Sequence, residues 1–289
     1  MEAGKKCGNL KQQINIRKHT GELEPFDREK FRESLRRSGA NDREIEEVLN
    51  EVLQELHEGI TTQKIYRIAY AKIRKLSQRS AGRYKLKKAL FQLGPTGFPF
   101  EHFVARLLEM EGYQVKTGQI IRGKCVEHEV DVVAKKPGKM IMAECKFHQT
   151  EGAKSDVKTS LYVRSRFHDI KNKLDEQKQD LIFEPMLITN TRFTLDAEQY
   201  GNCSGLKLLS WDFPQGNSLK DWIDRSGFHP ITVLKSLTKK ETKILMDKGI
   251  VLCREIKNIP DVLNDLPITQ RRKSSIVKEA ASMSHEAGS

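Results

Sequence analysis

Two neighbouring stretches near the middle of the chain constrain its fold and function most. Residues 127–133 (EHEVDVV) and 140–147 (MIMAECKF) alternate between polar and apolar side chains, and a lysine-rich turn with a Pro-Gly pair separates them. A period of two predicts a pair of antiparallel β-strands. We expect this hairpin to gather Asp131, Glu144 and Lys146 on one side of a small sheet. Two carboxylates and an ammonium group there are costly unless they hold a cation and carry out chemistry.

The composition restricts the partners and the compartment. The 289 residues suffice for two domains and a small third, and Lys plus Arg exceed Asp plus Glu by 51 − 39 = 12. This excess suits a phosphate backbone, although a basic soluble protein without such a partner also shows it. No run reaches the roughly 18 apolar residues of a membrane span, and the first residues lack a signal-peptide core. We expect a cytoplasmic protein with no membrane partner. The five scattered cysteines argue against disulfides and structural zinc.

The N-terminal part predicts a small helical domain behind a β-hairpin. Residues 1–12 are polar, and we expect them to be flexible. Residues 14–26 predict a hairpin that turns at Thr20-Gly21, and Asp27 predicts the N-cap of a helix. Three further helices are predicted from apolar residues at helical spacing. The run GPTGFP at 94–99 is a break, and we place the domain boundary there.

This order of elements resembles an ATP-cone, the nucleotide-sensing domain of ribonucleotide reductases and of certain bacterial transcriptional repressors. The motifs that carry the resemblance are IRK before Gly21 and EPFDREK after it, and the domain would cover residues 13–94. The resemblance implies that the hairpin closes over ATP or dATP. It implies the following cofactor-binding residues: Lys18 and Lys30 on the phosphates, Ile16 and Phe26 on the base, and Thr62 nearby.

Some positions depart from the ATP-cone pattern. His19 stands where a second basic residue is usual, and Tyr66 stands where some members have histidine. The choice between ATP and dATP therefore stays open. No GxxxxGK[ST] loop occurs, so P-loop hydrolysis is not predicted. The alternative is a helical domain with surface lysines and no ligand.

The middle part predicts the order helix, strand, HEVDV, turn and AECK. The helix, at residues 100–109, carries Glu101 beside an apolar stripe. This order resembles the PD-(D/E)xK nuclease superfamily, and most closely its Mrr-type restriction-endonuclease branch, which cleaves modified DNA. The resemblance continues through residues 161–167, 187–194 and 206–211 and implies a restriction-endonuclease-like α/β/α sandwich with a mixed central sheet at 96–226.

The nuclease resemblance also implies a catalytic set. Asp131, Glu144 and the Cys145 carbonyl would hold Mg²⁺ or Mn²⁺, because such hard cations prefer oxygen ligands. Lys146 would orient the attacking water or stabilise the developing charge. Glu101 matches an auxiliary acidic residue of the superfamily. Strand alternation places His128 off the catalytic face, so we expect it to be structural.

Other segments leave alternatives open. Lys154, Lys158, Arg164 and Arg166 either follow a DNA backbone or form a solvated helix face. Residues 227–269 predict a small helical segment whose Gly turn either contacts DNA or belongs to a packing appendage. Residues 270–289 predict a flexible tail that is partly helical or disordered.

Together these features predict an α/β multidomain protein that cleaves DNA. The function expected is a metal-dependent endonuclease under ATP or dATP control, acting as a dimer or higher oligomer because two sites are needed to cut both strands. A non-catalytic, nucleotide-responsive DNA-binding regulator is the main alternative. A junction resolvase or repair nuclease is a third. The DNA preference and the sign of nucleotide control stay open.

Overall fold

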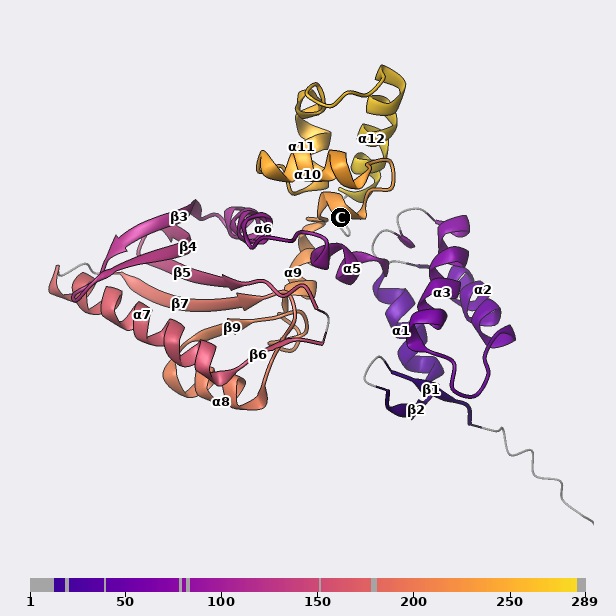
Figure 1. The fold of residues 1–289 in the computed structure, drawn as a ribbon, viewed down its shortest axis with the longest axis horizontal. Coiled ribbons are helices and arrows are strands. Elements are labelled where there is room, and N and C mark those ends of the chain that lie inside the picture. Colours follow the sequence, from indigo (N-terminus) through magenta and orange to yellow (C-terminus); the bar gives the residue numbers. More distant parts are fainter. Residues whose placement is uncertain are drawn as a thin grey trace, which may run out of the picture. The chain divides into compact units, whose positions relative to one another are not determined.

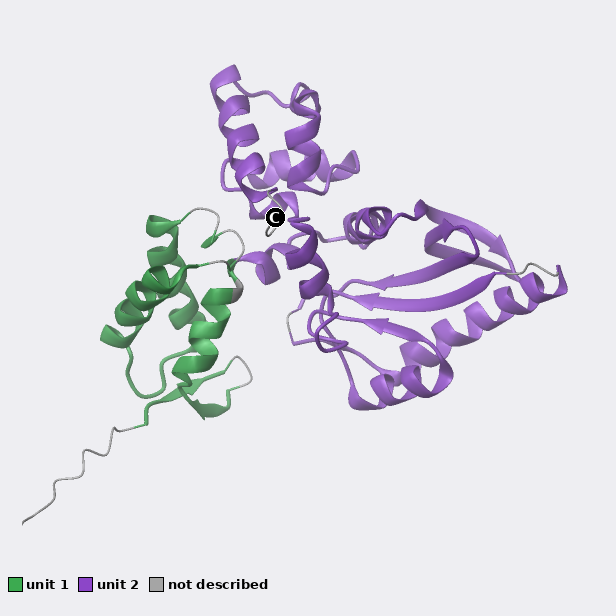
Figure 2. Cartoon of the chain, turned by 180° about the vertical axis from the view of Figure 1, so that it is seen from behind, with its two compact units in different colours: residues 1–84 green, residues 85–289 purple. Residues whose placement is uncertain are grey.

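The computed structural model describes residues 13–18, 21–38, 40–77, 80–81, 84–150, 152–177 and 181–284. The chain forms two compact units, residues 1–84 and 85–289 (Figure 2). Three features of the sequence analysis lie outside the described residues: the N-terminus at 1–12 predicted to be flexible, His19, which departs from the ATP-cone pattern, and the turn residue Thr20. None of the helices within the described ranges is long and apolar enough to cross a membrane.

The first unit is a β-hairpin followed by helices, as the sequence predicts (Figure 1). Its described elements are β1 (Asn15–Arg17), β2 (Leu23–Pro25), α1 (Arg28–Arg37), α2 (Asp42–Gln54) and α3 (Thr62–Leu76). The side chains of Asp27, Asn41 and Thr61 each accept a hydrogen bond from a backbone N–H in the first turn of the helix that follows. Leu35 and Val48 are fully buried where the helices meet. The N-cap predicted at Asp27 is therefore confirmed.

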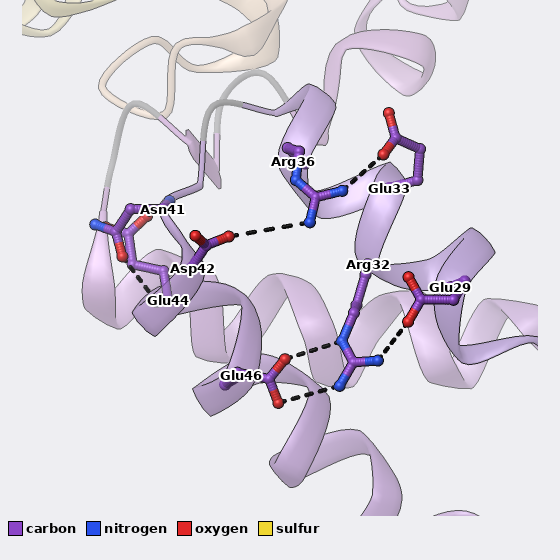
Figure 3. Close-up of polar contacts among 8 residues, drawn as sticks. All are labelled: Glu29, Arg32, Glu33, Arg36, Asn41, Asp42, Glu44 and Glu46. Carbon is purple, nitrogen blue, oxygen red and sulfur yellow. Dashed lines mark hydrogen bonds and ion pairs between the residues drawn. The ribbon is translucent and has the colours of Figure 1, made fainter.

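Ion pairs on the outside of this unit tie α1 to α2 (Figure 3). Arg32 donates to Glu46 at 2.9 Å and to Glu29 at 2.5 Å. Arg36 lies 3.9 Å from Asp42. These contacts are at the surface, so they orient the two helices while stabilising the fold only slightly.

The second unit contains a five-stranded mixed sheet in the order β3-β4-β5-β7-β9. Strands β3, β4 and β5 run antiparallel, whereas β7 and β9 run parallel to β5. The elements of this layer are α6 (Phe98–Met110), β3 (Gln114–Arg122), β4 (Glu127–Lys136), β5 (Lys139–Lys146), β6 (Lys154–Ser155), α7 (Val157–Glu176), β7 (Ile182–Thr189), β8 (Arg192–Phe193), α8 (Leu195–Ser204) and β9 (Lys207–Leu209). Helices α6 and α7 lie on opposite sides of the sheet (Figure 1), which confirms the predicted sandwich.

Alternation on β5 explains why this strand is central. Ile141 and Ala143 belong to one apolar core together with Phe103 of α6. Met142 belongs to a second core, with Phe167 of α7. Each core removes large apolar side chains from water, at a gain of roughly 25 cal/mol per Å². Both faces of the strand are therefore covered until its C-terminal end, where the polar residues begin.

The remaining helices complete the second unit. They are α5 (Leu86–Phe91), α9 (Leu219–Ser226), η1 (Ile231–Val233), α10 (Lys239–Asp247), α11 (Cys253–Asn258), η2 (Pro260–Leu263) and α12 (Gln270–Met283). Leu90 and Leu93 are buried in the same core as α6, so the two units separate after Tyr84, ahead of the predicted break at 94–99. The segment predicted as separate at 227–269 shares this core.

The tail predicted at 270–289 is helical in its first part, but its predicted flexibility is wrong there, and residues 285–289 lie outside the described residues. Residues 270–283 form helix α12, and Ile276, Ala280 and Met283 are buried in the core shared with α6 and α11. These three residues lie one helical turn apart, so one narrow stripe buries an otherwise polar, Ser- and Ala-rich helix.

The turn between α10 and α11 lies next to α6 on one side, while Lys248 is exposed on the other. A side chain at Gly249 would meet the His102 imidazole of α6. Arg106 of α6 donates to Glu255 at 2.9 Å, and the second oxygen of Glu255 accepts the Val251 N–H at 2.8 Å. Of the two readings of this turn, the structure therefore favours the packing appendage over direct contact with DNA.

Because α12 belongs to the core, Ile276→Ala should destabilise the second unit by about 2–5 kcal/mol, the usual cost of a cavity at a buried isoleucine. Urea unfolding followed by tryptophan fluorescence measures this, since both tryptophans, Trp211 and Trp222, lie in that unit. Ser275→Ala, at an exposed neighbour, is the control. Equal midpoints for the two variants would show that α12 is not part of the folded unit.

Candidate active site

The candidate site lies where β4 and β5 separate. Their pairing runs from Lys136↔Lys139 to Val132↔Ala143 and then stops. Beyond that point the Asp131 carboxylate accepts the Cys145 N–H at 2.7 Å, so a side chain takes the place of the next strand-to-strand bond. The N–H and C=O of a residue in a strand point to the same edge, so the Cys145 carbonyl also faces this gap. The Cys145 thiol side chain is buried on the α6 side.

Carboxylates from three elements meet at this gap. Burial raises the pKa of Asp131, which the Cys145 N–H partly offsets. Burial and the charge of Asp131 raise the pKa of Glu144. Burial, followed by the charges of Asp131, Glu129 and Glu144, raises the pKa of Glu101 on α6 to about 7. The exposed ammonium of Lys146 lowers the pKa of both Asp131 and Glu144. The four predicted catalytic side chains are therefore close enough for their charges to act on one another's ionisation.

Glu101 gives the metal-free protein a defined pH dependence. Its pKa of about 7 in the folded state lies above the ordinary value of 4.5, so the folded protein binds its proton more tightly than the unfolded chain does. The stabilisation from this group is complete below pH 4.5 and is lost as the pH rises through 7. In the presence of EDTA, the melting temperature of wild type should fall relative to that of Glu101→Gln over this window. Parallel curves would contradict the assignment.

The sequence did not predict that Arg166 contacts the candidate site. Arg166 of α7 donates to Glu144 Oε2 at 2.7 Å and also to the Glu129 carbonyl. Its guanidinium carbon lies 5.4 Å from the centre of the Tyr162 ring. The side chain is 13% exposed, so Arg166 does not belong to a solvated helix face, and its predicted contact with DNA stays a prediction. Arg164, two residues earlier, donates to the Ser204 carbonyl.

Lys154 and Lys158 are exposed, and their contact with DNA stays a prediction.

A small cavity of about 330 Å³ opens beside Arg166. It is lined by Glu127, His128, Glu129, Asp131, Glu144, Tyr162 and Arg166. The sequence does contain one indication of this position: Tyr162 and Arg166 are four residues apart, so their side chains lie on the same face of α7. The spacing does not show that this face of α7 is turned toward Glu144 of the sheet.

His128 has a structural contact, in line with the prediction. Its Nε2 lies 2.8 Å from the Asp169 carboxylate of α7, which also accepts the N–H groups of Cys125 and Val126. The His128 contact and these N–H groups hold the pKa of Asp169 well below its usual range. Asp169 thereby fixes the loop between β3 and β4 to α7.

The chemistry of the donor set fits a hard divalent cation. Mg²⁺ takes oxygen ligands and needs one or two carboxylates beside water and phosphate, which Asp131, Glu144 and the Cys145 carbonyl can provide. Within the part of the chain that the structure describes, no group of three or more His, Cys, Asp and Glu side chains could hold a metal. A closed structural metal centre is therefore not present in those residues, whereas an open catalytic site of two carboxylates remains compatible with them.

A second candidate site lies in the first unit, in a cavity of about 770 Å³. Of the residues predicted to bind nucleotide, Ile16, Phe26, Lys30 and Thr62 line it. Lys18 is not among the lining residues, and its ammonium pairs with Glu24 at 2.6 Å. Of the two lysines predicted to contact the phosphates, Lys30 lines the cavity, whereas the role of Lys18 stays a prediction.

Aromatic residues on the wall of this cavity were not predicted as ligands. The rings of Tyr66 and Tyr84 stack with centroids 5.1 Å apart at 10°. Both residues line the cavity, and burial raises the pKa of Tyr84 to about 12. The cavity is thus lined by the aromatic rings of Phe26, Tyr66 and Tyr84 and by the cations Arg28 and Lys30.

Comparison with known proteins identifies three domains in the chain. The ATP cone domain model matches residues 14–89, the Restriction endonuclease model matches 95–213, and the model of the AF1548-like C-terminal domain matches 229–284. An uncharacterized protein of Archaeoglobus fulgidus is 33% identical over 178 residues, which are 61% of this chain and 97% of that protein. This chain belongs to the AF1548-like family. It carries an ATP-cone domain in front of a restriction-endonuclease-type domain.

The AF1548-like assignment extends to solved structures. The crystal structure of the protein of unknown function AF1548 superposes with a TM-score of 0.54 at 32% identity and covers 64% of this chain and 97% of that chain. The MspJI restriction endonuclease in complex with a 27-mer oligonucleotide has 12% identity and a TM-score of 0.35, with 69% and 39% covered.

Proposed function

We propose that this AF1548-like protein is a Mg²⁺- or Mn²⁺-dependent DNA endonuclease whose activity responds to ATP or dATP. The observation that carries the proposal is the meeting of Asp131, Glu144, Glu101 and Lys146 where β4 and β5 separate. Structural carboxylates are rarely clustered with raised pKa values, and such clusters are typical of functional sites. The restriction-endonuclease match over residues 95–213 supports the same reaction class.

Each side chain has a distinct task in this reaction. A bound divalent cation supplies a more acidic water and neutralises charge on the phosphate. Asp131 and Glu144 hold the cation from two strands, and the Cys145 carbonyl adds a neutral oxygen. The Lys146 ammonium stabilises negative charge on the phosphate or holds the water. Glu101, whose pKa is about 7, can hold or release a proton at neutral pH.

The nucleotide is proposed to bind the cavity lined by Phe26 and Lys30. Its volume of about 770 Å³ is in the range of small-molecule and cofactor sites. Lys30 and Arg28 face a triphosphate as cations, and the aromatic wall receives the base. Because one site cuts one strand, double-strand cleavage requires two copies of the second unit, and we propose a dimer or higher oligomer.

The test is cleavage of supercoiled plasmid by the full chain with Mg²⁺ or Mn²⁺. Unmodified, methylated and branched DNA are compared, each with and without ATP or dATP. Nicked and linear products that require the metal support the proposal. Binding of DNA without nicking under every condition would instead identify a non-catalytic, nucleotide-responsive DNA-binding regulator.

A further inference from the structure

Arg166 already supplies a positive charge to the carboxylate that the metal requires. Its guanidinium lies 2.7 Å from Glu144 Oε2, and both side chains are shielded, at 13% and 21% exposure. A charge-assisted contact with little solvent around it is stronger than a surface ion pair. In the metal-free protein, Glu144 is therefore neutralised by a group of the chain itself.

Arg166 is also held from two other sides. It donates to the backbone carbonyl of Glu129 and stacks over Tyr162, one turn earlier on α7. These contacts fix the guanidinium at the mouth of the cavity that contains Asp131 and Glu144. A divalent cation that entered there would meet a fixed like charge, and it would compete for the same oxygen.

We propose that Arg166 is an exchangeable counter-ion, which leaves Glu144 when the divalent cation binds and so sets the metal concentration that the protein requires. This inference rests on the proposed function, because it concerns the same site. Once released, the guanidinium would be a planar donor suited to a phosphate of the DNA. Metal and DNA would then bind cooperatively, since each takes one partner of the same ion pair.

Direct binding of Mn²⁺ to the full chain, without DNA, tests the proposal. The electron paramagnetic resonance signal of free Mn²⁺ reports the bound fraction, so the readout does not depend on cleavage. Arg166→Met, which keeps the length and the apolar stem, should bind Mn²⁺ about tenfold more tightly, the change expected from removing a charge-assisted contact. Arg166→Lys should fall between this variant and wild type.

Two control variants come from the chain itself. Arg164→Met removes a cation from the same helix that contacts only the Ser204 carbonyl, and it should bind Mn²⁺ as wild type does. Glu144→Gln removes the proposed ligand and should weaken binding in both backgrounds. Melting temperatures in EDTA verify folding, and Mn²⁺ should raise that of Arg166→Met by more than that of wild type.

The outcomes separate the two claims. If wild type binds Mn²⁺ and Arg166→Met binds it equally or more weakly, Arg166 is not a competitor, while the metal site of the proposed function stands. If neither protein binds Mn²⁺, the metal site itself fails and both claims are overturned.

Discussion

Replacement of Glu144 by glutamine should lower the rate of metal-dependent plasmid nicking by about 10²–10³-fold, the loss typical of removing one group that stabilises charge in a transition state. Glutamine keeps the shape of the side chain but not the negative charge that holds the cation. It also retains an oxygen that can accept from Arg166, so the packing around α7 changes little. The rate is measured from the loss of supercoiled plasmid at saturating protein.

Glu184→Gln is the matched control for this substitution. Glu184 lies on the neighbouring strand β7, where it pairs with Lys139 at the far end of β5. Its replacement also removes a carboxylate from the sheet but leaves the candidate site unchanged, so nicking should continue at the wild-type rate. Equal rates for the two variants and wild type would remove Glu144 from the catalytic set. Equal losses would indicate a general effect of charge on the sheet.

Loss of Lys30 should weaken ATP binding by about 10–100-fold, whereas loss of Lys18 should have a much smaller effect. A hydrogen bond between a charged donor and a phosphate contributes about 1.5–3 kcal/mol, which gives this range. Lys30 lines the cavity of the first unit, but Lys18 pairs with Glu24 outside the lining residues. The family resemblance alone would predict similar effects for the two lysines.

Isothermal titration of ATP and dATP into the full chain measures these affinities. Arg36→Ala is the control, because Arg36 is a cation of the same helix that pairs with Glu33 on the surface and does not line the cavity (Figure 3). Unchanged affinity in Lys30→Ala would exclude this cavity as the nucleotide site. An equal loss in Lys18→Ala would show that the hairpin moves when the nucleotide binds.

Much of the candidate site could be predicted because it depends on short periodicities. Alternation over two strands placed Asp131, Glu144 and Lys146 together, and a helical stripe placed Glu101 beside the core that faces them. Each of these predictions uses only the direction of side chains along one element. The structure confirmed them because the strands are covered on both faces and cannot slip by one residue without exposing their apolar side chains.

The parts that could not be predicted depend on contacts between elements distant in sequence. Arg166 is a surface cation by its sequence context, and only the rotation of α7 over the sheet brings it to Glu144. Helix α12 has the composition of a disordered tail, because only three small or medium side chains, Ile276, Ala280 and Met283, form its buried stripe. When hydrophobicity is averaged along the sequence, the polar neighbours outweigh so narrow an apolar stripe.

Helix α6 connects the C-terminal helices to the candidate site, although the two are far apart in the sequence. The first turn of this helix carries Glu101, and Arg106 on the same helix donates a hydrogen bond to Glu255 of α11. The C-terminal helices therefore hold the helix that positions Glu101. A chain shortened to residues 1–226 would keep every proposed catalytic side chain, yet it would lose the support that holds Glu101 against Asp131 and Glu144.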